Sequence, residues 1–154
     1  MAAGVKLDAA RLEAFAEAFI GAANAAITPD QLTPSLWVDC DASLAELTPD
    51  AVGDLERLSP FGPGNARPRI RITDATIASR PEPFGGKSDH LAVMVKSRAS
   101  SRIIRLVGWN WAVRRDQLAA GMTIEAVVHP KLNRWNGNTR VEPELSDLRV
   151  CEPL

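Results

Sequence analysis

The sequence predicts a mainly β fold with an α lead-in: a five-stranded Greek-key barrel of the OB type, preceded by an α/β segment. Two observations support this prediction. Apolar residues recur with helical spacing near the N-terminus, and the spacing changes to alternation after residue 68. The later segments then follow the order three strands, one helix, two strands, which is the order of an OB barrel. With 154 residues and 45% hydrophobic content the chain can bury one core. We therefore expect a lead-in over 1–59 and the OB domain over 60–154.

The lead-in is expected to contain two helices and a short strand. Apolar residues recur at intervals of three and four over 8–26, with Asp8 as the N-cap, which indicates an amphipathic helix. Its apolar face must pack on another surface, and pairing between two copies of the chain is one way to cover it. Residues 36–40 are expected to form the strand, and Thr48 is expected to cap a second helix over 48–58.

The barrel elements follow from period-two alternation. The first strand is expected over 69–77, with a bulge near Thr73 and Asp74 where the parity of the apolar residues changes. The Asn136–Gly137 pair is a strong turn signal in the last loop. The other expected elements are hairpin loops over 85–88 and 97–101, strands over 91–96, 102–109, 122–129 and 138–150, and a helix over 111–120 between the third and fourth strands.

Charge is divided unevenly along the chain, although the formal net charge is only -1. Residues 1–65 hold three basic and ten acidic residues, whereas residues 67–140 hold fourteen basic and five acidic residues. Such an asymmetry is expected where one region of a protein meets a polyanion. The alternative is a solvated basic surface that is balanced by the acidic half folding against it.

An OB barrel holds oligonucleotides or oligosaccharides on its second and third strands and in its first and last loops. Basic residues fall on these elements, and single-stranded nucleic acid needs a positive groove together with flat side chains for base stacking. Trp135 lies at the tip of the last loop, where burial would be unusual, whereas Trp109 ends the third strand and could instead cover the barrel end. Structural roles are expected for Trp37 and Trp111. The predicted nucleic-acid-binding residues are Lys96, Arg98, Arg102, Arg105, Trp109, Lys131, Arg134, Trp135 and Arg140.

No catalytic residue, metal site or cofactor is expected in the chain. Neither His90 nor His129 lies near a carboxylate pair at a ligand spacing, so we expect one to open a strand and the other to close one. Cys40 and Cys151 are too few for a disulfide scaffold or a thiolate zinc site, which fits a reduced, cytoplasmic setting. No apolar run approaches the roughly 20 residues that a membrane span needs.

A long and unusual motif resembles a known family. Residues 58–65 are similar to the signature that precedes the OB domain of RecJ-type single-stranded-DNA-specific exonucleases. They read Leu58-Ser59-Pro60-Phe61-Gly62-Pro63-Gly64-Asn65, and Pro68 follows. Residues 44–48 resemble the approach to that signature, and residues 1–4 resemble the end of the family's glycine- and histidine-rich motif. The closing hairpin of the family is similar to Asn133-x-Trp135-x-Gly137 with Leu145, Asp147 and Leu148.

The resemblance implies the C-terminal part of a RecJ-like 5′–3′ exonuclease of DNA repair and recombination. This part would comprise the end of the substrate-binding subdomain and the OB domain that guides single-stranded DNA toward a nuclease site. In that family, Asp and His residues of an upstream phosphoesterase domain hold two catalytic Mn²⁺ or Mg²⁺ ions. These ligands precede the matched part, so the isolated chain is not expected to be an enzyme. Two alternatives stay open: a protein-interaction module that docks on a nuclease subunit or a single-strand-binding protein, and an inactive truncated remnant.

Overall fold

A computed structural model describes residues 4–97 and 101–151 of the chain. The chain divides into two compact units between Leu36 and Trp37. This is not the division expected after residue 59, because the segment 37–59 supplies a strand and a helix that pack on the barrel. In the part of the chain that is described, no helix is long and apolar enough to cross a membrane.

The first unit contains the predicted amphipathic helix. A short 3-10 turn, η1 (Ala9–Arg11), leads into α1 (Leu12–Ala26), and a second 3-10 turn, η2 (Pro29–Leu32), follows. The Asp8 carboxylate accepts a hydrogen bond from the Ala10 amide at 3.3 Å, as expected of an N-cap. The prediction of a helix over 8–26 is therefore confirmed. The aromatic rings of Phe15 and Phe19 stack on its apolar face, with centroids 6.0 Å apart.

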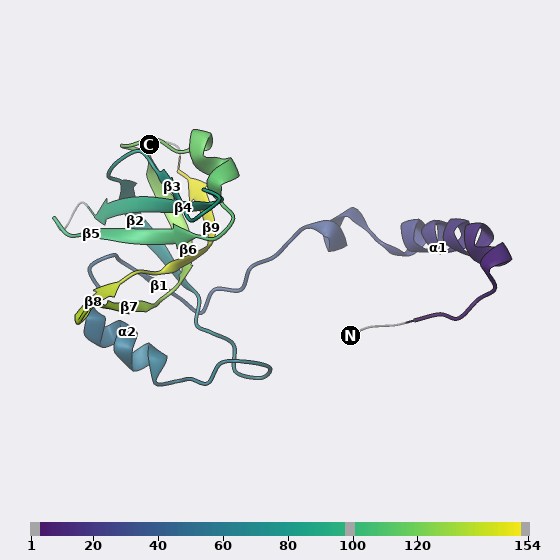
Figure 1. Cartoon of the computed structure of the whole chain (residues 1–154), viewed down its shortest axis with the longest axis horizontal. Coiled ribbons are helices and arrows are strands. Elements are labelled where there is room, and N and C mark those ends of the chain that lie inside the picture. The colour runs from purple at the N-terminus through teal and green to yellow at the C-terminus, as the bar shows by residue number, and fades with distance from the viewer. Residues whose placement is uncertain (1–3, 98–100, 152–154) are drawn as a thin grey trace. The chain divides into compact units, whose positions relative to one another are not determined.

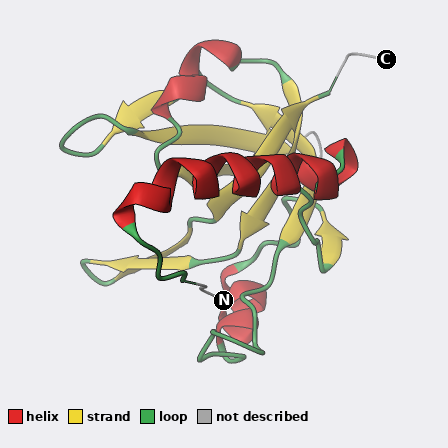
Figure 2. Ribbon diagram, turned by 90° about the vertical axis from the view of Figure 1, so that its right-hand side faces the viewer, coloured by secondary structure: helices red, strands yellow, loops and turns green. Residues whose placement is uncertain are grey.

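The second unit is a closed five-stranded barrel, shown in Figures 1 and 2. Its strands are β2 (Ile70–Ile77), β4 (His90–Ser97), β5 (Ile103–Gly108), β6 (Thr123–His129) and β9 (Glu144–Val150). They pair in the order β2-β6-β9-β5-β4, and pairing between β2 and β4 closes the barrel. β5 and β9 run parallel where Val107 meets Glu144, and the other neighbours are antiparallel. This arrangement confirms the predicted OB-type fold.

Alternation along the strands fills the barrel with aliphatic side chains. In β2, Ile70 and Ile72 are buried on one parity, whereas Ala75 and Ile77 are buried on the other. The pairing of β2 with β6 shifts register between Ile72 and Ala75, which confirms the predicted bulge. Asp74 lies in this bulge, where it accepts a hydrogen bond from the Leu44 amide at 2.9 Å and another from the Ser97 hydroxyl.

The segment before the barrel adds a short strand at one edge of its sheet. β1 (Cys40–Ala42) pairs in parallel with the start of β2. The strand predicted over 36–40 is therefore displaced toward the C-terminus, because pairing with the chain before β2 starts only at Asp39, whose amide donates to the Arg69 carbonyl at 2.9 Å. Trp37 is 84% exposed, so the structural role expected for it is wrong.

The predicted second helix is confirmed as α2 (Pro49–Glu56), with the Thr48 hydroxyl accepting a hydrogen bond from the Ala51 amide. Val52 of this helix is fully buried in the barrel core. The motif that follows it forms a tight loop. The Asn65 side-chain amide donates to the carbonyls of Leu58 and Pro60, each at 2.9 Å, and Gly64 has the positive φ of 80° that glycine tolerates best.

Several other elements differ from the sequence prediction. β3 (Glu82–Phe84) was not predicted; it pairs with β4, and the expected hairpin loop over 85–88 joins the two. The single strand predicted over 138–150 is interrupted at the buried Pro143, which separates β8 (Asn138–Val141) from β9. β8 pairs with another strand not predicted, β7 (Leu132–Trp135), to form a hairpin.

A further difference is the helix predicted over 111–120, which is only a 3-10 helix, η3 (Ala112–Gln117). Its start is fixed by a close contact, since a Cβ built on Gly108 would lie 2.8 Å from Trp111 side-chain atoms. Trp111 also packs against the core, as its expected structural role requires. The expected placement of His90 and His129 is confirmed, because they open β4 and close β6.

Candidate nucleic-acid interface

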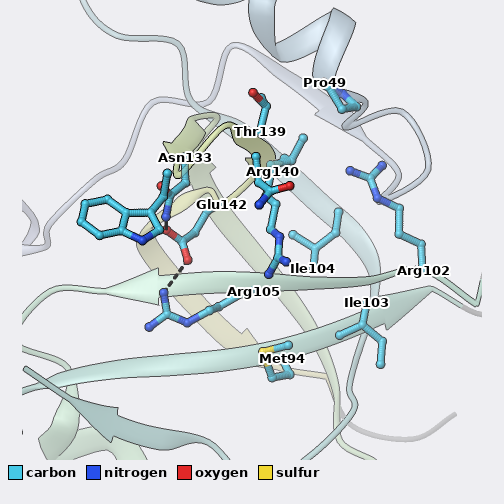
Figure 3. Close-up of a pocket in the computed structure, with 13 residues that line it drawn as sticks. Pro49, Met94, Arg102, Ile103, Ile104, Arg105, Asn133, Thr139, Arg140 and Glu142 are labelled. Carbon is cyan, nitrogen blue, oxygen red and sulfur yellow. Dashed lines mark hydrogen bonds and ion pairs between the residues drawn. The ribbon is translucent and has the colours of Figure 1, made fainter.

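A pocket of about 550 Å³ lies between the outer face of β4 and β5 and the β7–β8 hairpin (Figure 3). Met94 of β4 is paired with Arg105 of β5, and their neighbours along each strand are buried, so both side chains face outward. The lining residues are Pro49, Met94, Arg102, Ile103, Ile104, Arg105, Asn133, Trp135, Asn138, Thr139, Arg140, Val141 and Glu142. The pocket therefore lies where an OB barrel commonly binds ligands.

Three arginines line this pocket, in different electrostatic settings. Arg105 forms an ion pair with Glu142, drawn as a dashed line in Figure 3. Arg140 extends from the hairpin toward β5 in the same view and is exposed. Among the residues that the structure describes, no carboxylate forms an ion pair with Arg140. Arg102 is half-buried and lies just before β5, on the side of the pocket where Pro49 lies.

Arg105 is held by more than one contact. Its guanidinium carbon lies 4.5 Å from the centroid of the Phe84 ring, a cation–π geometry. The other oxygen of Glu142 accepts a hydrogen bond from the Asn133 side-chain amide at 2.6 Å. The three strands β3, β5 and β7 therefore meet through one chain of contacts. Its members Arg105, Glu142 and Asn133 line the pocket and are called its floor.

The β7–β8 hairpin presents an exposed indole. Trp135 is 73% exposed and pairs across the hairpin with Asn138. Between them, Asn136 and Gly137 have φ angles of 48° and 77°, the left-handed conformation that a tight hairpin turn needs. The turn prediction is therefore confirmed, and the expected exposure of Trp135 is confirmed with it.

The base of the hairpin is anchored on α2 through Glu56. This carboxylate accepts hydrogen bonds from the Leu132 amide at 3.0 Å and from the Arg134 guanidinium at 2.7 Å. Burial alone would raise the pKa of Glu56, but the hydrogen bonds from Leu132 and Arg134 and the charges of Arg134 and Lys131 outweigh it and leave the pKa below its ordinary value. The hairpin therefore has a fixed base and an exposed tip.

A second aromatic group lies beside the pocket. Trp109 is 48% exposed, and its ring centroid lies 4.7 Å from that of His90 and 5.9 Å from that of Phe84. Burial would raise the pKa of Glu144, but hydrogen bonds from Lys131 and Trp109 and nearby positive charges lower it overall. Trp109 therefore packs against His90 and Phe84 and leaves part of its ring open to solvent.

The predicted binding residues are only partly brought together. Arg102, Arg105, Trp135 and Arg140 line the pocket, and Lys96 is exposed on the same face of β4, paired with Ile103. By contrast, Lys131 forms an ion pair with Glu144 at 2.5 Å, and Arg134 pairs with Glu56. Arg98 lies outside the described residues. A role in binding stays a prediction for each of these side chains.

Sequence reasoning missed three residues of this region. Phe84 lies on the unpredicted β3, and its short proline-flanked segment shows no period that would reveal a strand. Glu142 was missed because it lies within residues 138–150, which were expected to form one uninterrupted strand. Asn133 was noted only within the closing-hairpin motif. The contacts that join these residues to Arg105 connect distant parts of the chain, so no local signal could have shown them.

In residues 4–97 and 101–151, no group of three or more His, Cys, Asp or Glu side chains is placed to hold a metal ion.

Fold and pocket together define an OB barrel with a basic, partly aromatic pocket on one face. The RecJ OB domain family matches residues 38–147, and the chain belongs to this family. The chain is 23% identical over 152 residues to the single-stranded-DNA-specific exonuclease RecJ of Bacillus subtilis strain 168, covering 99% of this chain and 19% of that protein.

Solved structures of RecJ from Thermus thermophilus share the fold. The complex with Mn²⁺ has a TM-score of 0.69 and 24% identity, covering 98% of this chain and 21% of that one. The complex with Mg²⁺ has a TM-score of 0.67 and 24% identity, covering 96% and 21%. The chain thus spans about a fifth of the length of the relatives it matches. The resemblance to the RecJ family is confirmed.

Proposed function

We propose that this chain is the single-stranded-DNA-binding OB module of a RecJ-like 5′–3′ exonuclease. It would guide the strand toward a nuclease site elsewhere in the enzyme, in cytoplasmic DNA repair and recombination. The observation that supports this most directly is the pocket, which combines Arg102 and Arg140 with the exposed indole of Trp135 on one face of the barrel. Membership of the RecJ OB domain family supports the same assignment.

The chemistry of the pocket favours a single strand over a duplex. Guanidinium groups bind phosphate oxygens, whereas an exposed indole offers a flat surface on which an unpaired base can stack. In a duplex the faces of the bases are already covered by their neighbours, so Trp135 would have no partner. The open tip and fixed base of the hairpin suit a surface that must hold an unpaired strand.

Fluorescence anisotropy with a labelled oligothymidine, titrated at several salt concentrations, tests the proposal. We expect weak to moderate binding whose log affinity falls by about 0.7 per phosphate contacted for each tenfold rise in salt. Arg140→Ala should reduce that slope by about one contact. The matched control is Arg149→Ala, which removes the same charge from β9, pairs with Glu125 and does not line the pocket.

Trp135→Ala separates stacking from charge in the same assay. It should leave the salt slope unchanged and weaken binding by about 1–3 kcal/mol, or roughly 5- to 150-fold. Absence of binding at low salt, or wild-type affinity in Trp135→Ala and Arg140→Ala alike, would refute the proposal. Salt-insensitive binding to a nuclease subunit or a single-strand-binding protein without DNA binding would instead favour a protein-interaction module.

A further inference from the structure

We propose that Glu142 makes the pocket prefer bases with an exocyclic amino group, so that cytosine is bound more tightly than thymine or uracil. The inference rests on the proposed binding of single-stranded DNA. In this proposal the base of a nucleotide lies against the floor of the pocket, and Glu142 is a specificity-determining residue.

Glu142 reduces the net positive charge at the floor of the pocket. Glu142 lines the pocket and its side chain is only 20% exposed. Its carboxylate forms an ion pair with Arg105, so the positive charge of Arg105 is largely offset at this point. A phosphate approaching Arg105 would also approach Glu142 and be repelled. Phosphates are therefore expected nearer Arg140, and the floor is left for the base.

Strand β7 sets the direction from which a base would approach Glu142. Asn133 and Trp135 are two positions apart on β7, so their side chains lie on the same face of that strand. The Asn133 amide donates to Glu142 at 2.6 Å. A base stacked on Trp135 would therefore present its edge toward the pair of Asn133 and Glu142.

The remaining hydrogen-bonding capacity of Glu142 determines which bases it can bind. An ionised carboxylate only accepts, and its two oxygens offer about four lone-pair positions. Arg105 and Asn133 each use one, which leaves Glu142 able to accept from a ligand but unable to donate. The N4 amino group of cytosine is a donor that suits this acceptor. Thymine and uracil present the O4 acceptor at the same position, which would face the carboxylate without a proton between them.

The test compares short oligodeoxycytidine with oligodeoxyuridine of equal length at pH 8 by fluorescence anisotropy. These bases differ at the C4 substituent and the N3 proton but not in the C5 methyl group, so stacking on Trp135 is closely matched. We expect the cytidine strand to bind about tenfold more tightly, the order of effect of one hydrogen bond to a charged group. Equal affinities for the two strands, with binding still present, would overturn the inference and leave the proposed function intact.

Glu142→Gln supplies a second, independent readout. The amide of glutamine can donate as well as accept, so the preference should fall toward equality. Because Arg105 loses its ion pair, the salt slope should also rise by about 0.7 as one further phosphate contact becomes available. Glu125→Gln is the matched control, since Glu125 pairs with Arg149 and does not line the pocket. A preference retained in Glu142→Gln, or lost equally in Glu125→Gln, would overturn the inference.

If neither oligonucleotide binds the wild-type chain at low salt, the proposed function fails and this inference fails with it. Thermal unfolding of each variant shows whether it is folded. The comparison of the two strands on the unmodified chain needs no variant, so the inference is decided even if Glu142→Gln does not fold.

Discussion

Substitution of Glu56 by alanine should destabilise the barrel and release the β7–β8 hairpin from α2. The Leu132 amide donates to Glu56 at 3.0 Å, and Leu132 is only 8% exposed, so its N–H would be left without an acceptor. Such a loss costs about 1–3 kcal/mol. The pair with Arg134, whose side chain is 59% exposed, adds less than about 1 kcal/mol.

We therefore expect a loss of about 2 kcal/mol in the free energy of unfolding, which for a unit of this size corresponds to a fall in Tm of roughly 6–12 °C. Urea denaturation followed by tryptophan fluorescence or circular dichroism measures the change. Binding of oligothymidine should weaken as well, without a change of salt slope, because Trp135 at the tip would no longer be held in place.

Asp54→Ala is the matched control for this substitution. It removes an acidic side chain from the same helix, but Asp54 pairs with Arg57 at 3.3 Å, and both side chains are more than 70% exposed. This variant should lie within about 0.5 kcal/mol of the wild type. Equal stability of Glu56→Ala and Asp54→Ala would refute the view that Glu56 anchors the hairpin.

Further outcomes follow from the barrel and its carboxylates. Gly108→Ala should cost about 1–3 kcal/mol in urea denaturation, because its Cβ would lie 2.8 Å from Trp111; wild-type stability would contradict that contact. The lowered pKa of Glu144 means that its stabilising contribution is present above about pH 4.3 and is lost as pH falls through the folded-state pKa. Acid unfolding should therefore be less steep in Glu144→Gln, and an unchanged pH profile would argue against it. The purified chain should not degrade single-stranded DNA with Mg²⁺ or Mn²⁺, and metal-dependent release of nucleotides that co-purifies with the folded chain would contradict this.

The barrel strands could be predicted because burial imposes a period on them. The change of parity in β2 revealed the bulge between Ile72 and Ala75, and Asn136–Gly137 revealed the last turn. A longer helix was predicted over 111–120, because Gly121 stands where a helix commonly ends with glycine. Trp111, which precedes η3, packs against the barrel core and lies against Gly108, so the packing of this segment on the barrel competes with its helix propensity.

The candidate site was harder to predict than the fold, because a count of charges treats every basic residue as available. The structure pairs Arg105, Lys131 and Arg134 with glutamates that lie 37, 13 and 78 positions away in sequence. These pairings leave a basic face narrower than composition suggests. They also show that Arg134, expected to bind DNA, has an anchoring contact with α2 that no local pattern reveals.

Residues 40–56 belong to the folded barrel, which limits where a gene fusion could join this domain to another protein. β1 extends the sheet, and Val52 of α2 fills the core beneath the hairpin. A gene fusion joined at the proline- and glycine-rich loop would inherit the later strands without the helix that covers them. A recombinant that begins before β1 would keep this segment and carry over the pocket together with the helix that supports it.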